Sequence, residues 1–173
     1  MSELRQPAAA NDRETAAHRD DKMELRLWLR LLTCSSLIEQ NVRGALRLQF
    51  DTTLPRFDLM AQLDRAPEGL TMSELSARMM VSNGNITGLA DRLVEEGLVK
   101  RTPSQRDRRS SHINLTPAGK KAFDAMTPVH EGWIDQMMGG LSRQEMQQLF
   151  TLLGRLKQSV HQNTVEADKG DGA

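Results

Sequence analysis

The sequence has 173 residues but only one cysteine, no tyrosine and 3% aromatic residues. The single cysteine, Cys34, excludes an intrachain disulfide and a metal site made from several cysteines. The chain also lacks an apolar run near the roughly 20 residues that a membrane-spanning helix needs, and residues 1–22 lack the hydrophobic stretch of a signal peptide. We therefore expect a cytoplasmic protein without membrane contacts.

The residues that most enzymes need do not converge in this sequence. Its four histidines are His18, His112, His130 and His161, and none stands at metal-ligand spacing from a cysteine or a carboxylate. There is no Ser-His-Asp pattern and no glycine-rich phosphate loop. We therefore predict no catalytic residues, no metal site, no cofactor and no enzymatic activity.

Hydrophobic residues make up 38% of the chain, against 27% charged residues, and they follow helical spacing over most of its length. A first helix is predicted at 23–49, where two apolar stripes indicate two packing partners. In a chain this small, one of those partners can be a second subunit. A second helix is predicted at 54–66.

A short helix, a turn, a longer helix and a hairpin are predicted next. Thr71 and Glu74 form a capping box that opens the short helix. The longer helix, at 82–96, has one apolar stripe that faces a core. Two strands are predicted at 98–102 and 111–115, joined by a polar and basic connection. This order is that of a winged helix-turn-helix.

Two further helices complete the chain. The Thr116-Pro117 pair opens the first of them, because threonine is a good N-cap and proline is tolerated at the first helical position. The Gly139-Gly140 pair ends it. Ser142 and Glu145 form a second capping box that opens the last helix. The predicted fold class is mainly α with a small β-hairpin wing.

The helix at 82–96 is the candidate recognition helix, which would read bases in the major groove with its N-terminal residues. Asparagine bonds adenine at two points, and serine and threonine adapt to bases or phosphates. Gly84 and Gly88 lower helix stability by roughly 1 kcal/mol each relative to alanine, and close approach to DNA would explain them. The alternative is an ordinary polar helix face. The candidate reading residues are Ser82, Asn83, Asn85 and Thr87.

Positive charge is concentrated around the hairpin of a chain whose net charge is +0. Such a cluster beside a helix-turn-helix is typical of phosphate binding. Arg106, Arg108 and Arg109 are expected at the tip of the wing, where arginine can enter the minor groove. We expect the carboxylate of Asp107 to hold the guanidinium of a neighbouring arginine, Arg109, in a fixed orientation. The alternative is a solvated turn of charges.

Four segments, taken together at their spacing, resemble the MarR family. They are Gly-Leu-Thr-Met-Ser-Glu-Leu-Ser (69–76), Asp-Arg-Leu-Val-Glu-Glu-Gly-Leu-Val-Lys-Arg (91–101), Asp-Arg-Arg (107–109) and Leu-Thr-Pro-Ala-Gly (115–119). The resemblance implies a homodimer, formed by the first, fifth and sixth helices, that binds a palindromic DNA operator. It also implies a repressor that a small aromatic acid or phenol releases from DNA.

The resemblance assigns roles to residues and to segments of the chain. Arg92 and Arg101 match family positions that support the wing or touch phosphate, and Asp107 with Arg109 matches the wing pair. We expect a disordered N-terminal extension at 1–21, a dimerisation helix at 22–53, a winged helix-turn-helix lobe at 54–116, C-terminal dimerisation helices at 117–162 and a disordered tail at 163–173.

Family ligands usually bind where the first, second and fifth helices meet the DNA-binding lobe. Arginines there suit a carboxylate or a phosphate, and apolar side chains suit a ring. The alternative is that the apolar residues are core and the arginines are surface. The candidate ligand-binding residues are Trp28, Cys34, Ile38, Arg43, Arg47, Arg56, Phe57 and Met60.

Two segments, 27–32 and 53–58, are also similar to a subgroup that controls aromatic-acid catabolism. Some of its members sense acyl-CoA thioesters of hydroxycinnamic acids, so the effector is expected to be an aromatic acid or its CoA thioester. One alternative is redox sensing through Cys34, although reactive thiols need access and a lowered pKa, and a buried small residue is the simpler interpretation of Cys34. Another is a winged-helix module for protein contacts.

Overall fold

The computed structural model describes residues 22–103 and 111–170, with the side chains of the last helix described as far as Asn163. The chain forms two compact units, Met1–His130 and Glu131–Ala173, which are treated separately below. The extension at 1–21, for which disorder was expected, and the wing tip at 104–110 lie outside the described residues.

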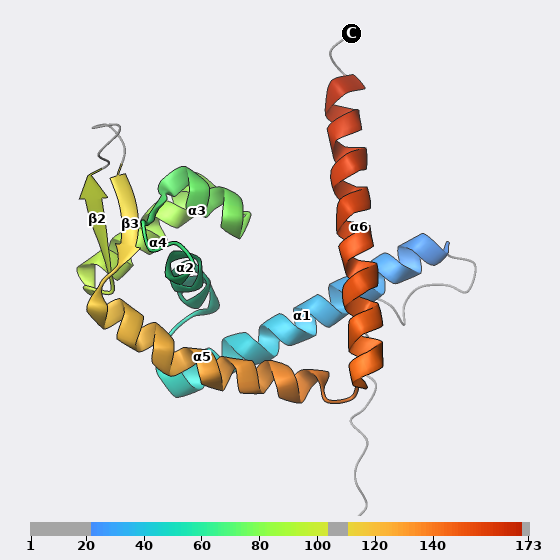
Figure 1. The fold of residues 1–173 in the computed structure, drawn as a ribbon, viewed down its shortest axis with the longest axis horizontal. Coiled ribbons are helices and arrows are strands. Elements are labelled where there is room, and N and C mark those ends of the chain that lie inside the picture. The colour runs from blue at the N-terminus through green and yellow to red at the C-terminus, as the bar shows by residue number, and fades with distance from the viewer. Residues whose placement is uncertain (1–21, 104–110, 171–173) are drawn as a thin grey trace, which may run out of the picture. The chain divides into compact units, whose positions relative to one another are not determined.

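The first unit begins with a long helix and a short one. Helix α1 (Met23–Phe50) ends at Asp51, which adopts a left-handed conformation with φ 48°. Helix α2 (Leu54–Asp64) starts after Thr53 and carries Pro55 in its first turn, where a missing N–H is harmless. Figure 1 shows α2 at the centre of the lobe, and it packs against α3, α4 and β3.

The lobe at 54–116 contains the predicted helix-turn-helix and a small sheet. Strand β1 (Leu70–Thr71) leads into α3 (Met72–Met79), which is followed by α4 (Asn83–Glu95) and the strands β2 (Val99–Pro103) and β3 (Ser111–Leu115). The sheet order is β1-β3-β2, and both pairings are antiparallel. Ile113 is the central residue, because it pairs with Leu70 on one side and Arg101 on the other.

The last two helices leave the lobe. Helix α5 (Pro117–Met138) passes from the first unit into the second, and α6 (Arg143–Gly170) belongs to the second. The predicted capping box at the start of α6 is confirmed, since the Glu145 backbone N–H donates to Ser142 Oγ (3.3 Å) and the Ser142 N–H donates to a Glu145 carboxylate oxygen (2.8 Å). The Ser142 hydroxyl also donates to this carboxylate (2.7 Å), and together with the Ser142 N–H it holds the pKa of Glu145 below its ordinary value.

The helix α6 is longer than expected. The tail at 163–173 was predicted to be disordered, but the backbone is helical to Gly170. Residues 163–169 contain no glycine or proline, so nothing in this stretch breaks a helix before Gly170. The sequence pattern failed here because the absence of a core face was taken as the absence of a helix.

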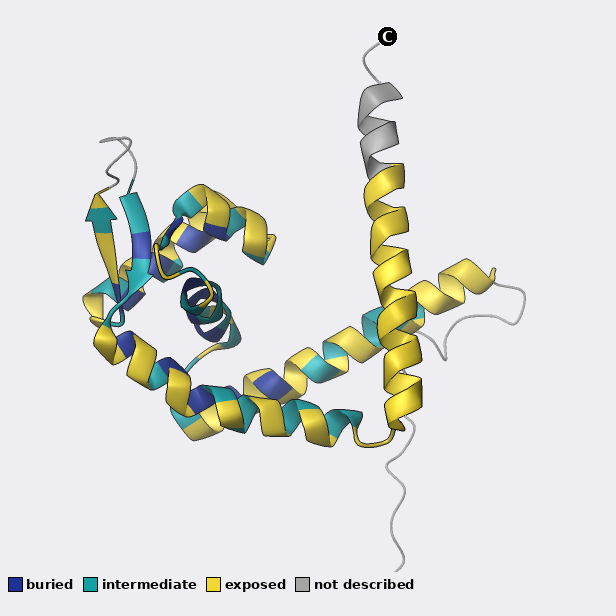
Figure 2. Ribbon diagram, viewed as in Figure 1, coloured by how far each residue is buried: buried dark blue, intermediate teal, exposed yellow. Residues whose placement is uncertain are grey.

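Buried side chains concentrate in the first unit (Figure 2). Apolar residues of α2, α3, α4 and β3 form its core, among them Leu59, Leu75, Leu93 and Ile113, each with 0% of its surface exposed. Every described side chain of α6 is exposed in a single subunit, including Phe150 at 75% and Leu152 at 58%.

Candidate nucleic-acid interface

The turn between α3 and α4 places the candidate recognition helix. The capping box of Thr71 and Glu74 is formed as predicted, with the Glu74 N–H donating to Thr71 Oγ1 (3.2 Å). The Thr71 N–H and hydroxyl each donate to the Glu74 carboxylate (2.8 Å), and these two bonds lower its pKa. At the other end of α3, Met80 adopts a left-handed conformation with φ 53°. The Ser76 hydroxyl donates to the Val81 carbonyl (2.5 Å) and closes the turn.

Helix α4 is anchored on one side and bare on the other. Ile86, Ala90 and Leu93 are buried against the lobe. On the exposed side, Gly84 and Gly88 stand one turn apart, and no described atom lies within 4 Å of where a Cβ would be at either position. Both glycine positions are therefore open space beside exposed polar residues such as Asn83 and Thr87.

The polar residues predicted to read DNA fall into two groups. Ser82, Asn83 and Thr87 are exposed at the start of α4. Ser82 is the N-cap residue as expected, but its side chain makes no capping bond within the described structure, so its hydroxyl stays available. Thr87 Oγ1 donates to the Asn83 carbonyl (2.9 Å), a bond within the helix.

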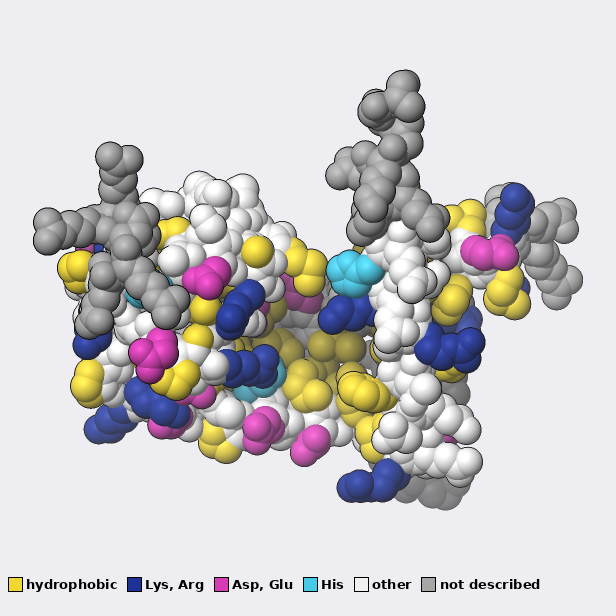
Figure 3. All heavy atoms as spheres, turned by 45° about the horizontal axis from the view of Figure 1, so that its top comes forward, with side chains coloured by type: hydrophobic (Ala, Val, Ile, Leu, Met, Phe, Trp, Pro, Cys, Tyr) yellow, Lys and Arg dark blue, Asp and Glu magenta, His cyan; other side chains and the backbone are white. Residues whose placement is uncertain are grey.

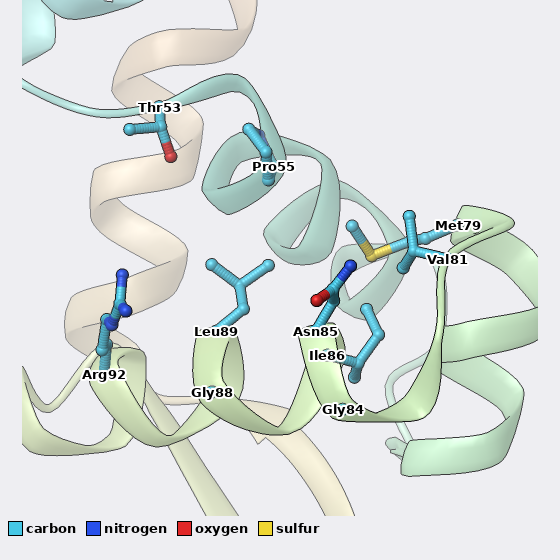
Figure 4. A pocket seen from close by; sticks show the side chains of 10 residues that line it. All are labelled: Thr53, Pro55, Met79, Val81, Gly84, Asn85, Ile86, Gly88, Leu89 and Arg92. Carbon is cyan, nitrogen blue, oxygen red and sulfur yellow. The ribbon is translucent and has the colours of Figure 1, made fainter.

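The second group lies on the flank of α4 that faces the start of α2. Asn85, Leu89 and Arg92 point from α4 into a cavity of about 460 Å³, as Figure 4 shows. Its opposite wall contains Thr53 and Pro55. The remaining lining residues come from α4 itself and from the end of α3 and the turn after it: Met79, Val81, Gly84, Ile86 and Gly88. Asn85 is exposed like Ser82 and Asn83, but its side chain lies on the flank of α4 that faces α2.

The strands of the wing are tied to both the lobe and the recognition helix. In β3, Asn114 accepts a hydrogen bond from Thr102 Oγ1 (2.7 Å) and donates one to the Pro67 carbonyl (3.2 Å). In β2, Arg101 forms an ion pair with Asp91 of α4. Arg101 therefore links β2 to α4 within a single subunit, and its predicted role in supporting the wing or touching phosphate stays a prediction.

The tip of the wing holds four predicted DNA-binding residues that the structure does not describe. Arg106, Asp107, Arg108 and Arg109 all lie within 104–110, outside the described residues. Their roles therefore stay predictions from the sequence.

The C-terminal end of α4 is fixed by a second ion pair. Arg56 of α2 donates to both carboxylate oxygens of Glu96, with a distance of 2.8 Å from Nη1 to Oε1. This pairing lowers the pKa of Glu96. Such pairs leave acidic and basic side chains interspersed over the part of the lobe seen in Figure 3, on its left side.

The start of α5 is packed tightly against the end of α4. The Thr116 hydroxyl donates to the Gly97 carbonyl (2.7 Å), and the Gly119 N–H donates to Thr116 Oγ1 (3.0 Å). A Cβ on Gly119 would lie 1.9 Å from the Leu98 carbonyl oxygen. This contact explains the Leu-Thr-Pro-Ala-Gly segment physically, because only glycine fits the approach.

The eight candidate ligand-binding residues occupy different environments. Phe57 and Met60 belong to the core, and the Phe57 ring lies 5.4 Å from Phe123 and 4.6 Å from His130. Arg56 is paired with Glu96, as described above. The other five lie along α1: Trp28, Cys34, Arg43 and Arg47 are exposed, and Ile38 is half-buried. Cys34 is thus accessible in a single subunit, where burial was the simpler interpretation.

A second cavity, also of about 460 Å³, lies between α1, α2 and the end of α3. Of the eight candidates, only Arg43 lines this cavity, and none of the eight lines the cavity beside α4. The charged and polar residues that line the cavity between α1, α2 and α3 are Glu39, Arg43, Asp58, Gln62 and Arg78. Its apolar lining residues are Leu54, Pro55, Met79 and Val81. Sequence reasoning missed Asp58 and Arg78, whose only local signal is a charge beside apolar neighbours.

Two other kinds of site are absent from the residues that the structure describes. Among the residues that the structure describes, no helix is long and apolar enough to cross a membrane. Within the same residues, no group of three or more histidine, cysteine, aspartate or glutamate side chains is placed to hold a metal ion.

Comparisons with known proteins agree with this architecture. The model of the MarR family matches residues 50–110. The transcriptional activatory protein BadR of Rhodopseudomonas palustris is 30% identical over 128 residues, which cover 71% of this chain and 73% of BadR. The HTH-type transcriptional regulator PecS of Dickeya dadantii is 27% identical over 146 residues, covering 83% of this chain and 88% of PecS.

Solved structures share the fold. A MarR family transcriptional regulator from Silicibacter pomeroyi is 31% identical with a TM-score of 0.68, covering 79% of this chain and 94% of that chain. The MepR–DNA complex of S. aureus has a TM-score of 0.69 at 21% identity, covering 80% of this chain and 99% of that chain. At that identity, MepR supports the winged-helix fold alone.

Proposed function

Since this chain belongs to the MarR family of DNA-binding transcriptional regulators, we propose that it is a homodimeric repressor. In this proposal it binds a palindromic operator and leaves it when a small aromatic acid, or the CoA thioester of one, binds. The observation that carries the proposal is the exposed start of α4, which offers polar side chains and bare backbone at the end of the helix that such lobes insert into the major groove.

Base reading is assigned to the exposed start of α4. Ser82 and Asn83 are free to face base edges, and Asn83 can bond adenine at two points. Asn85 and Arg92, on the flank, are better placed for the sugar–phosphate backbone at the groove edge. The wing arginines Arg106, Arg108 and Arg109 are proposed to contact the minor groove and phosphates, with Asp107 orienting Arg109.

The homodimer is proposed to use the exposed apolar residues of the terminal helices. On α6, Leu149, Leu153 and Leu156 keep 42%, 40% and 37% of their surface exposed in one subunit. Contiguous apolar surface of this extent on a helix marks an interaction site. A two-fold symmetric partner would present two copies of α4 about one turn of DNA apart, which matches a palindromic operator.

An effector is proposed to act where α1 and α2 meet the lobe. The region combines cations such as Arg43 with an apolar wall that contains Pro55 and Met79, the combination that an aromatic acid needs. Arg47 and Trp28 remain candidates for the outer part of such a site, with Arg47 suited to a phosphate of a CoA thioester. A ligand bound here would change the affinity for DNA by acting on the turn before α4.

A fluorescence polarisation titration tests the proposal directly. It uses DNA from upstream of the protein's own gene, a shuffled duplex and a series of salt concentrations, with and without aromatic acids and their CoA thioesters. We expect tighter binding to the upstream DNA, a steep loss of affinity with salt, and release by one of the compounds. Equal binding to both duplexes would refute sequence-specific regulation and favour a protein-contact module.

The proposed DNA contacts of the wing arginines are tested by comparing a wing variant with a control variant. A variant in which Arg106, Arg108 and Arg109 are alanine should lose affinity for every duplex, and its salt slope should fall by roughly 1 for each lost phosphate contact. An Arg65→Ala control, at an exposed position after α2, should leave the slope unchanged. If operator binding occurs but no compound releases it, peroxide treatment of wild type and Cys34→Ser tests the redox alternative, which the exposure of Cys34 permits.

A further inference from the structure

The cavity between α4 and the start of α2 gathers polar side chains that have no partner within the described structure. Its volume is about 460 Å³, and its polar lining side chains are Thr53, Asn85 and Arg92. All three residues are exposed, and none of their side chains forms a hydrogen bond or an ion pair with a described residue. Figure 4 shows Thr53 on the side of the segment before α2 and the other two on the side of α4. The cavity therefore brings a hydroxyl, an amide and a guanidinium from two elements to one space.

The charge of this cavity is positive. Arg92 lines it, and none of its described lining residues is an aspartate or a glutamate. The neighbouring cations differ, because Arg56 is paired with Glu96 and Arg101 with Asp91. A guanidinium with open donors, in a site without acids, favours an anion that offers several oxygen atoms.

Thr53 supplies a donor that the fold itself does not use. It is the N-cap residue of α2, where a threonine hydroxyl ordinarily accepts a bond from an N–H of the first turn. In this chain the Thr53 side chain makes no capping bond within the described structure. The backbone carbonyl of Thr53 instead accepts bonds from the N–H groups of Arg56 and Phe57 (3.1 Å each). The hydroxyl is therefore open to a ligand.

We propose that this cavity binds one phosphate of the operator backbone in each half-site, held by Arg92 and Asn85 of α4 and by the hydroxyl of Thr53. The inference rests on the proposed function, and it adds a DNA contact from outside the helix-turn-helix. A phosphate has unesterified oxygen atoms for donors on both sides of the cavity. The cavity volume is in the range of sites for whole small ligands, so the adjoining sugar also fits, against the apolar side chains of Pro55 and Leu89.

The position of the cavity suits a contact with the DNA backbone. Ser82 and Asn83, at the exposed start of α4, are the residues proposed to face base edges, and the cavity lies on the flank of the same helix. Sugar–phosphate strands border the major groove, so a helix in the groove meets phosphates on its flanks. Gly84 and Gly88 also line the cavity, and since neither has a side chain, neither narrows the approach of a strand. A phosphate bound here bridges α2 and α4, so operator binding fixes the spacing of these two helices.

Neutral linkages at single positions of the operator test this contact. A set of operator duplexes carries one methylphosphonate each, which removes the charge of one phosphate, and each duplex is titrated with the full chain by fluorescence polarisation. We expect one position in each half-site at which the change weakens wild-type binding about tenfold, the effect of a lost hydrogen bond to a charged group. At that position Arg92→Gln and Thr53→Val should each respond less, because they have already lost the contact. Arg92→Gln should also lower the salt slope by about 1 for each half-site.

Stability measurements separate a binding role of Thr53 from a structural one. Because its hydroxyl makes no capping bond within the described structure, Thr53→Val should melt at the same temperature as wild type and yet bind DNA about tenfold more weakly. Thr53→Ser keeps the hydroxyl and should bind DNA as tightly as wild type. The matched controls are Thr151→Val on α6 and Arg65→Gln after α2, both at exposed positions, and they should respond to every methylphosphonate as wild type does.

Three results would overturn the inference: no phosphate whose effect depends on Arg92 and Thr53, different phosphates for the two residues, or a Thr53→Val variant that binds the operator as tightly as wild type. An Arg92→Gln variant that keeps wild-type DNA affinity but is no longer released by an effector would also overturn it, and would assign the cavity to a small anion. If wild type still prefers the operator to shuffled DNA, only this inference fails. Equal binding of wild type to both duplexes overturns the proposed function.

Discussion

Replacing the exposed glycines of α4 by alanine should move stability and DNA affinity in opposite directions. Glycine in a helix interior is less stable than alanine by about 1 kcal/mol. At Gly88 no described atom lies within 4 Å of the new methyl group, so no clash offsets this gain. For a chain of 173 residues, Gly88→Ala should therefore raise Tm by roughly 2–4 °C. Gly84 is in the first turn, and its gain should be smaller.

The effect on DNA follows from the position of the two glycines. Both positions are open space on an exposed stretch of α4, and the polar residues around them can reach base edges only if the helix approaches closely. A methyl group at Gly88 holds the helix away from the groove, so operator affinity should fall by about tenfold, which is about 1.4 kcal/mol. Non-specific affinity, which depends on phosphate contacts, should change little.

Thermal unfolding at fixed protein concentration and polarisation with operator and shuffled DNA measure the two effects. Gly132→Ala is the matched control, since Gly132 is also a helical glycine with no described atom within 4 Å of its Cβ position. It should raise Tm without changing operator affinity. A Gly88→Ala variant that is more stable and still binds its operator as tightly as wild type would refute the close approach.

Three further predictions concern the framework around α4. Gly119→Ala forces its Cβ against the carbonyl of Leu98 and should destabilise the protein by about 3 kcal/mol, seen as a fall in Tm; an unchanged Tm would contradict the contact. Glu96→Gln weakens the pair with Arg56 and should lower stability by about 1 kcal/mol, since solvent screens a half-exposed pair. The pKa of Glu96 is lowered in the folded state, so this gap should be present at neutral pH and close in urea titrations as the pH falls below 4.5; a gap that persists in acid would show that the charge is irrelevant. Met80→Gly removes a left-handed side chain that is 91% exposed and should stabilise by up to about 1 kcal/mol; a loss of stability would mean that Met80 packs against a second subunit.

The sequence predicted most helices and strands correctly because the patterns that specify them involve residues close together in the chain. Both capping boxes specify a helix start through bonds that span three residues, and both form where they were predicted. Strand β1 was missed for the opposite reason. Its two residues become a strand only by pairing with Ile113 and His112, more than 40 positions away, and no local pattern encodes that register.

The candidate site was only partly predictable for the same reason. The sequence identified α4 and its polar residues, but which flank faces α2 depends on packing between helices, and packing sends Asn85 into a cavity. It identified Arg56 as a cation suited to a carboxylate, and the structure supplies that carboxylate from within the chain, at Glu96. Asp58 and Arg78 come from different helices, so only the fold brings them to one cavity.

The recognition helix is held unequally along its length, and this asymmetry favours control from its N-terminal end. Toward the C-terminus, Glu96 is bonded to α2 and Asp91 to the wing, so two ion pairs tie this half of the helix to its neighbours. At the N-terminus, Ser82 makes no side-chain cap within the described structure and two glycines loosen the first turns. A ligand of small size can supply only a few kcal/mol of differential binding. That energy is enough to shift a weakly capped helix start, whereas moving the other end would also disturb the buried packing of Leu93. In the proposed function, the turn at Val81 is therefore where a small effector would act.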